Sequence, residues 1–253
     1  MSMFREKYCI ANWKMNFTQS HIRSFISRWK SKNFAESHVK TIFCPSFTDI
    51  NITAELLKDS EAEIGAQNVC YESSGAFTGE VSCAMLKEVE CKWVIIGHSE
   101  RRTIFNETDN IIQEKLKIIL TEDLHPILCI GESKVERDAG RALDVITKQL
   151  SILSEIYEDV SSNIVIAYEP VWAIGTGDTA TSDMISNAHI DIRNILDSNG
   201  LNGGESSILY GGSVNDNNAS EISNIDDVDG FLIGGASLDV DKFYTIYNNF
   251  KEK

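Results

Sequence analysis

Eight short apolar runs recur along the chain, and they limit its possible folds more than any other feature. Most are continuously apolar rather than alternating, which is typical of parallel strands that are covered on both faces. Amphipathic stretches separate them, most clearly at residues 111–120, 142–157 and 184–197, which we predict to be helices. The runs, in order, are YCIANW, VKTIFC, AEIGAQN, KWVIIG, HPILCI, NIVIAYE, SSILYGG and DGFLIGG.

This alternation of strands and helices predicts a parallel α/β fold. Eight repeats within 253 residues favour a closed (β/α)8 barrel, and an open doubly wound sheet is the alternative. The chain has only three prolines and no Pro-rich or Ser-rich linker that would divide it. We therefore expect one domain over residues 1–253.

Charge and composition argue against several classes of function. A net charge of −15 argues against nucleic acid as a partner, because phosphate backbones are bound through clustered Lys and Arg. The six cysteines are scattered without a C-x-x-C pair, which favours reduced thiols in a cytoplasmic protein. The N-terminus is charged and no apolar run approaches about 18 residues, so neither secretion nor a membrane span is expected. The five histidines form no ligand-spaced pair, so we expect no metal.

Polar residues at the ends of the apolar runs are the first candidates for function, because a (β/α)8 barrel carries its active site at the C-terminal ends of its strands. Asn12 and Lys14 end the first run, His98 the fourth, Glu132 the fifth and Glu169 the sixth. A cation, an imidazole and a carboxylate around one cavity suit the abstraction of a proton beside a carbonyl group.

Two glycine pairs, Gly211/Gly212 and Gly234/Gly235, end the last two runs. Backbone N–H groups without side chains can approach an anion closely, particularly where a helix begins. A phosphate site after the seventh and eighth strands is common in this fold. We therefore expect the acidic chain to provide a local positive pocket for a small phosphorylated substrate.

Two carboxylates compete for the role of the base, and position alone does not choose between Glu132 and Glu169. Glu169 is followed directly by a segment, residues 170–180, with the features of a lid. A proline stiffens one end, Trp172 and Ile174 provide apolar cover, and glycines permit unusual dihedral angles. The lid favours Glu169 as the base.

The same segment contains GTGDTA, residues 175–180, which matches a short dinucleotide-binding fingerprint. Such a site needs its first glycine directly after a strand and an acid at the end of the next strand. Five residues separate the strand end from Gly175, and a predicted helix follows. We therefore expect no nucleotide cofactor.

A long segment, VCYESSGAFTGEVS at residues 69–82, follows the third run. Long glycine-bearing loops in such barrels are usually functional, either over the active site or in a partner interface. A flexible surface excursion is the alternative.

Seven motifs in order along the whole chain resemble the triosephosphate isomerase family. They are ANWKMN (11–16), GAFTGE (75–80), IIGHSERR (95–102), CIGE (129–132), AYEPVWAIGTG (167–177), YGGSV (210–214) and GFLIGGASL (230–238). The resemblance implies a cofactor-independent isomerase of glycolysis and gluconeogenesis. It would interconvert dihydroxyacetone phosphate and glyceraldehyde 3-phosphate through an enediolate.

The resemblance also implies residue roles. Glu169 would move the proton, His98 would be a neutral electrophile at the carbonyl oxygen, Lys14 would supply positive charge, and Asn12 would hold a substrate oxygen. The phosphate would be bound by N–H groups of Gly175, Ser213, Gly234 and Gly235. Ile174 and Leu232 would form an apolar clamp over Glu169, and Tyr210 and Ser213 would latch the lid. The lid itself would comprise Pro170, Val171, Trp172, Ala173, Ile174, Gly175, Thr176 and Gly177.

Further residues enter in supporting roles. We expect Ser99 and Glu100 behind His98, and Cys129 as a buried packing residue near the site. The resemblance implies a homodimer in which residues 67–80 reach a second subunit, with Thr78 close to that subunit's site. Where the family usually has Lys at the C-terminal hinge of the lid, this chain has Asp178, and we hypothesise that the reversed charge alters the balance between open and closed lids.

Two other functions remain possible at this point. One is a non-catalytic relative, although Asn12, Lys14, His98 and Glu169 are all present. The other is a differently specific phosphate-binding barrel enzyme, such as an aldolase in which Lys14 forms a Schiff base.

Overall fold

The computed structural model describes residues 5–34, 38–154, 156, 164–174 and 179–251. Its strands form a closed barrel in which every pairing is parallel and β1 pairs with both β2 and β8. The predicted (β/α)8 TIM barrel is therefore confirmed, and the open doubly wound sheet is wrong. The strands are β1 Lys7–Asn12, β2 Val39–Cys44, β3 Glu63–Ala66, β4 Trp93–Ile96, β5 His125–Ile130, β6 Val165–Tyr168, β7 Ser207–Tyr210 and β8 Gly230–Ile233.

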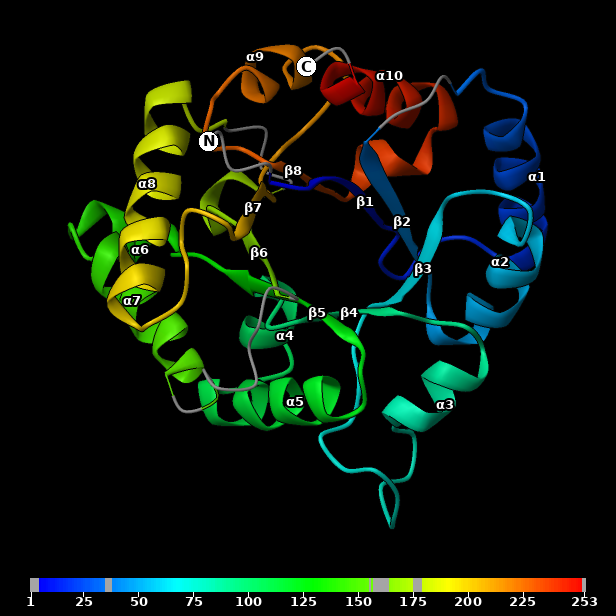
Figure 1. Cartoon of the computed structure of the whole chain (residues 1–253), viewed down its shortest axis with the longest axis horizontal. Coiled ribbons are helices and arrows are strands. Elements are labelled where there is room, and N and C mark those ends of the chain that lie inside the picture. Colours follow the sequence, from blue (N-terminus) through cyan, green and yellow to red (C-terminus); the bar gives the residue numbers. More distant parts are fainter. Residues whose placement is uncertain (1–4, 35–37, 155, 157–163, 175–178, 252–253) are drawn as a thin grey trace.

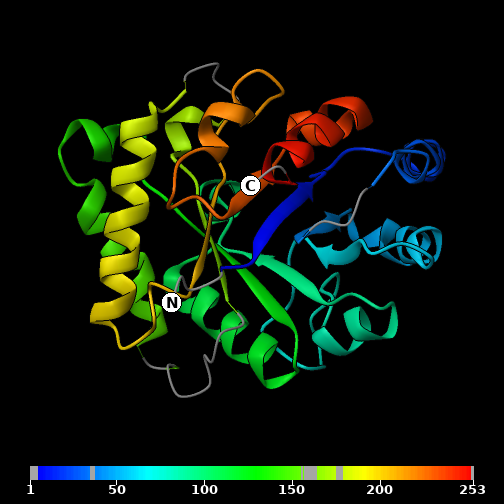
Figure 2. The same cartoon turned by 45° about the horizontal axis from the view of Figure 1, so that its top comes forward.

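Helices surround the barrel on its outer side (Figure 1). Figure 2 shows the longest, α8, running along the outside of the strands. The α-helices are α1 Gln19–Lys30, α2 Ile50–Leu57, α3 Cys83–Glu88, α4 Ser99–Thr103, α5 Asp109–Thr121, α6 Lys134–Asp138, α7 Ala142–Leu150, α8 Ser182–Ser198, α9 Ala219–Ser223 and α10 Val240–Lys251. The 3-10 turns are η1 Phe47–Asp49, η2 Ser151–Leu153, η3 Val171–Ala173 and η4 Gly235–Leu238.

Capping residues explain where several helices begin. The hydroxyl of Thr108 accepts the N–H of Ile111 at the start of α5, and that of Thr181 accepts the N–H of Met184 at the start of α8. Such caps satisfy N–H groups that have no partner inside a helix. The predicted helices at 111–120 and 184–197 are thus confirmed, with one extra turn or less at their ends.

The predicted helix at 142–157 is too long, because α7 ends at Leu150 and a 3-10 turn follows. Ser151 and Ser154 each donate their hydroxyl to a backbone carbonyl three residues back, on Lys148 and Ser151 respectively. Serine side chains that bond to nearby backbone compete with regular helix formation.

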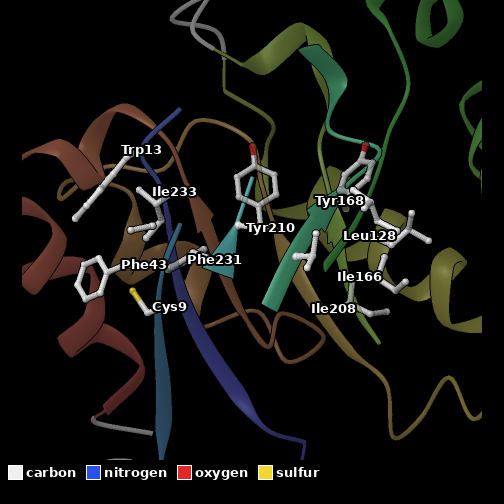
Figure 3. Packing of buried hydrophobic residues seen from close by; sticks show 14 of the residues in the cluster. Cys9, Trp13, Phe43, Leu128, Ile166, Tyr168, Ile208, Tyr210, Phe231 and Ile233 are labelled. Carbon is white, nitrogen blue, oxygen red and sulfur yellow. The ribbon is translucent and has the colours of Figure 1, made fainter. Parts of the chain in front are cut away.

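Two separate apolar layers hold the fold together. Alternate strand residues fill the inside of the barrel, including Tyr8 and Ile10 of β1 and Ala167 of β6. Their neighbours face outward and pack under the helices, as Figure 3 shows for Cys9, Phe43 and other labelled residues. This two-residue period fixes which side chains reach the inside of the barrel mouth.

A buried carboxylate joins the first strand to the last at the opposite end of the barrel. Asp229, which is 0% exposed, lies 2.8 Å from Arg5 Nε, 3.2 Å from Lys7 Nζ and 2.7 Å from Arg193 Nη2. It also accepts the N–H of Ile208 at 3.0 Å. Several protein groups therefore stabilise the buried charge of Asp229, at the point where the last strand pairs with the first.

The long segment between β3 and α3 projects away from the barrel (Figure 1). It has no helix or strand between Gln67 and Ser82. The six cysteines are all buried and unpaired. Among the described residues, no helix is long and apolar enough to cross a membrane.

Candidate active site

The period of two along the strands carries specific residues into the barrel mouth. Ile10, Ala167, Leu209 and Leu232 point into the barrel. Two positions after them come Asn12, Glu169, Gly211 and Gly234, all of which line a cavity of about 490 Å³. Lys14, His98, Ile174, Ser213 and Gly235 line the same cavity. The structure thus brings together the four residues predicted for catalysis.

Glu169 lies at the floor of this cavity and is only 2% exposed. Its Oε1 lies 3.1 Å from Nε2 of His98, and its Oε2 accepts the backbone N–H of Ser99 at 3.0 Å. The carboxylate is therefore held against the first turn of α4, which provides the hydrogen bonds that a buried charge requires.

His98 caps the helix that follows it. Its Nδ1 accepts the backbone N–H of Glu100 at 3.2 Å. A neutral ring with an accepting Nδ1 carries its proton on Nε2, the nitrogen that faces Glu169 and the cavity. The imidazole can therefore present an N–H donor to an oxygen atom in the cavity.

Lys14 adopts a left-handed backbone, with φ 52°, which is uncommon for a residue other than glycine. Two side chains hold this turn: Asn12 Oδ1 accepts the Lys14 N–H at 3.1 Å, and Gln67 Nε2 donates to the Lys14 carbonyl at 2.8 Å. Such unusual geometry persists where the surroundings fix it, often at functional sites. Nζ of Lys14 lies 2.7 Å from Oε1 of Glu100. The sequence placed Gln67 only at the start of the segment expected to reach a second subunit, and its contact with Lys14 was not predicted.

The glycine-rich side of the cavity leaves room for neighbouring side chains. A β-carbon at Gly211 would lie 2.9 Å from Cγ of Glu169, and one at Gly234 would lie 3.3 Å from Cε of Lys14. Ser213 donates its hydroxyl to the carbonyl of Ala173 at 2.5 Å and its N–H to the same oxygen at 3.2 Å. The predicted phosphate donor Ser213 is therefore occupied by the lid segment in this structure.

The first part of the predicted lid is a 3-10 turn, η3, and it is attached to Glu132. The indole Nε1 of Trp172 donates to Oε1 of Glu132 at 2.9 Å, and Tyr168 donates its hydroxyl to Oε2 at 3.1 Å. The N–H of Val171 donates to the Glu132 carbonyl at 3.0 Å. Glu132, 0% exposed, also lies 3.1 Å from Nε of Arg137. It thus anchors the lid segment.

Glu132 is not among the residues that line the cavity. Glu132 lies two positions after Ile130, which belongs to the outer layer, whereas Glu169 lies two positions after Ala167, which faces into the barrel. The same period of two that places Glu169 in the mouth therefore turns Glu132 away from it. The geometry favours Glu169 over Glu132 as the base.

The remaining predicted lid residues are placed only in part. Pro170 and Ile174 flank η3, and Ile174 and Leu232 line the cavity. Gly175, Thr176, Gly177 and Asp178 lie outside the described residues. Burial raises the pKa of Tyr210 to about 12, and its hydroxyl lies by the backbone of Ala180, the last residue of the segment 170–180.

The predicted supporting residues lie around Glu169 and Lys14. Ser99 contacts Glu169 and Glu100 pairs with Lys14, as the contacts above show. Cys129 is buried inside the barrel, where burial first and the nearby Glu169 charge second raise the pKa of its thiol well above the usual value. Its position agrees with a packing role.

A second cavity of about 270 Å³ lies beside the first and shares Asn12, Lys14 and His98 with it. Its lining includes Met15, which is 95% exposed, and Phe105, which is 62% exposed. The predicted partner-binding residue Thr78 is exposed and lies in the projecting segment. Exposed apolar side chains of this size are typical of an interface.

No group of His, Cys, Asp and Glu side chains that could hold a metal ion occurs in the part of the chain that the structure describes.

Comparisons with known proteins agree on one family. The family model described as triosephosphate isomerase matches residues 7–250. The chain is 44% identical over 242 residues to the triosephosphate isomerase of Aquifex aeolicus, covering 95% of this chain and 98% of that protein. It is also 44% identical over 248 residues to the protein of the same name from Alkaliphilus metalliredigens, covering 96% of this chain and 99% of that protein. It is 43% identical over 238 residues to the protein of that name from Saccharomyces cerevisiae, covering 93% of this chain and 95% of that protein.

Proposed function

Because the chain belongs to the triosephosphate isomerase family, we propose that it interconverts dihydroxyacetone phosphate and glyceraldehyde 3-phosphate. The observation that carries this proposal is the pairing of Glu169 and His98 at 3.1 Å on the floor of a cavity that Lys14 and four glycines also line. This set can remove a proton beside a carbonyl group, stabilise the oxyanion and accommodate a phosphate.

In the proposed reaction, Glu169 takes a proton from the carbon next to the carbonyl and returns it to the neighbouring carbon. The Nε2–H of His98, which now points at Glu169, donates a hydrogen bond to the carbonyl oxygen and assists the transfer of the hydroxyl proton from one substrate oxygen to the other, while Asn12 holds a substrate oxygen. Lys14 stabilises the negative charge that develops on the enediolate oxygen. Since Ser99 now holds one carboxylate oxygen, Glu169 must leave that N–H to reach the substrate.

Lid closure would accompany this movement. Ser213 now uses its N–H and hydroxyl on Ala173, so it can bind a phosphate only when the lid segment shifts. The phosphate would then meet the N–H groups of Ser213, Gly234, Gly235 and Gly175. Ile174 and Leu232 would exclude water above Glu169, and a carboxylate that is shut off from water binds a proton more tightly.

A coupled assay of glyceraldehyde 3-phosphate conversion tests the reaction, and absence of product with the wild type would contradict it. Glu169→Asp should lower kcat on the order of a hundredfold, because withdrawing the carboxylate by about 1 Å misplaces the reacting atoms. Glu132→Gln is the matched control, since it changes a buried carboxylate outside the cavity. It should retain kcat within about tenfold while lowering the free energy of unfolding by roughly 1–3 kcal/mol through its weakened contacts.

The alternative functions make different predictions. An aldolase-like enzyme would form an imine on Lys14, which borohydride would trap as a stable adduct detectable by mass spectrometry. A non-catalytic relative would bind triose phosphates without converting them. An imine at Lys14 would also have to give up the contact of its Nζ with Oε1 of Glu100, which lies 2.7 Å away.

We further propose a homodimer in which the projecting segment around Thr78 enters the second cavity of the partner subunit. The exposed Met15 and Phe105 beside that cavity support this interface. Sedimentation of Thr78→Arg should show monomers, whereas Val135→Arg, at a position that is 73% exposed on α6, should sediment like the wild type. A wild type that sediments as a monomer would contradict the proposal.

Residues 1–253 would form one catalytic domain. The proposed activity places the enzyme in glycolysis and gluconeogenesis, in the cytoplasm.

A further inference from the structure

Two charged residues on the rim of the main cavity have no role in the chemistry described above. Asp239 and Lys242 both line this cavity beside Gly235 and Leu238, where η4 leads into α10. Both side chains are exposed. They therefore face any substrate that approaches the glycine-rich side of the site.

The backbone holds these two residues on one turn. Oδ1 of Asp239 accepts the N–H of Asp241 at 2.9 Å and the N–H of Lys242 at 3.1 Å. A side chain that accepts N–H groups in this way fixes the start of the helix. The carboxylate of Asp239 and the backbone of Lys242 are thus fixed next to each other on the rim, and the exposed side chain of Lys242 extends from that point.

Lys242 differs from the other cations near this end of the barrel. Lys14 pairs with Glu100, and Arg28 and Lys32 both pair with Asp241. Within the described ranges, the ammonium group of Lys242 forms no ion pair. Its charge is therefore not offset by direct contact with a carboxylate.

The charge of the whole chain makes such a group significant. A net charge of −15 repels a phosphorylated substrate, which carries negative charge itself. Charges at the rim of a site act mainly on the rate of encounter, while those in contact with reacting atoms act on the chemical step. An unpaired cation on the rim counteracts the repulsion where the substrate passes.

We propose that the positive charge of Lys242 attracts the substrate phosphate to the cavity and that the negative charge of Asp239 repels it. The two charges together would then set the rate at which the substrate is captured. The inference rests on the proposed isomerase activity and adds a pair of guiding residues to it. Neither side chain takes part in proton transfer. Their effects on capture should therefore have opposite signs and should both vanish when salt screens the charges.

Steady-state kinetics of three variants test this proposal at low ionic strength and at about 1 M KCl, where the screening length is about 3 Å. Lys242→Gln should lower kcat/KM about threefold at low salt, as expected for one charge about 8–10 Å from a phosphate in water. Asp239→Asn, which keeps the accepting oxygen that begins α10, should raise kcat/KM by a similar factor. In both variants kcat should be unchanged, and both effects should disappear in 1 M KCl.

Lys58→Gln is the matched control, because it removes the same charge from the chain at a residue that follows α2 and does not line this cavity. It should match the wild type at both salt concentrations. A fall in kcat with Lys242→Gln, a change in kcat/KM that persists in 1 M KCl, or equal effects of Lys242→Gln and Lys58→Gln would overturn the proposal. An inactive wild type would instead refute the proposed function.

Discussion

The close approach of Gly211 to Glu169 allows a quantitative test of how accurately the proposed base must be positioned. In Gly211→Ala the new β-carbon would lie 2.9 Å from Cγ of Glu169. Carbon atoms in favourable contact are about 3.5–4.0 Å apart, so the Glu169 side chain must shift by roughly 0.6–1 Å. A misplacement of about 1 Å lowers a rate on the order of a hundredfold, which corresponds to about 2.7 kcal/mol of activation free energy.

The assay is the coupled measurement of kcat for Gly211→Ala, with thermal unfolding as a check that the variant is folded. A double-mutant cycle with Glu169→Asp identifies the cause. If the added methyl group acts by displacing the base, its effect on kcat should be much smaller when the acid is already shortened. Strict additivity of the two substitutions, or a kcat for Gly211→Ala within twofold of the wild type, would refute the reasoning.

Two further predictions concern stability. Burial lowers the pKa of His189 from 6.5 to about 4, so the unfolded chain binds a proton below pH 6.5 that the native state does not. Above pH 6.5 the buried His189 therefore does not lower the free energy of unfolding. As the pH falls from 6.5 toward 4, the free energy of unfolding decreases, and the decrease approaches about 3 kcal/mol. Urea unfolding at pH 7 and pH 4.5 should therefore show a smaller acid-induced decrease for His189→Asn than for the wild type, and an equal decrease would contradict this account. Asp229→Asn should lower the free energy of unfolding at pH 7 by about 3 kcal/mol or more, because it leaves Arg193 and two further cations beside a neutral side chain. The exposed Asp226→Asn should stay within about 0.5 kcal/mol of the wild type, and equal losses in the two variants would argue against a special role for the buried charge.

Much of the barrel and of its mouth could be predicted from the sequence, because both depend on local patterns. Continuous apolar runs indicate buried parallel strands, and the polar residue that ends each run lies at the mouth. Asn12 and Glu169 follow this rule in the structure. The rule needs no knowledge of which strands pair.

The choice between Glu132 and Glu169 needed more than these patterns. Both follow buried strands, and nearly every residue of those strands is apolar, so the sequence does not mark which positions face into the barrel. The closed sheet makes that distinction, since Ala167 faces in and Ile130 faces out. In a strand buried on both faces, the two-residue period has no polar side to reveal it.

Hydrogen bonds between segments that are far apart in the chain could not be predicted from the sequence either. Gln67 bonds to the carbonyls of Lys14 and Cys44, 53 and 23 residues away, and so supports the left-handed turn at Lys14, one of the proposed catalytic residues. Its side chain carries no pattern that indicates this function. The residues proposed for the chemistry could be named from the sequence, but those that hold them in place required the fold.

The ion pairs of Asp229 have a consequence for synthesis of the chain. They connect Arg5 and Lys7 to a residue 224 and 222 positions later. At about 5–20 residues per second, a ribosome needs on the order of ten seconds or more to reach that residue. During this time β1 can pair with β2, but the edge that later meets β8 has no partner. The nascent protein therefore carries an open sheet edge, a template for association with other chains, until β8 has been made.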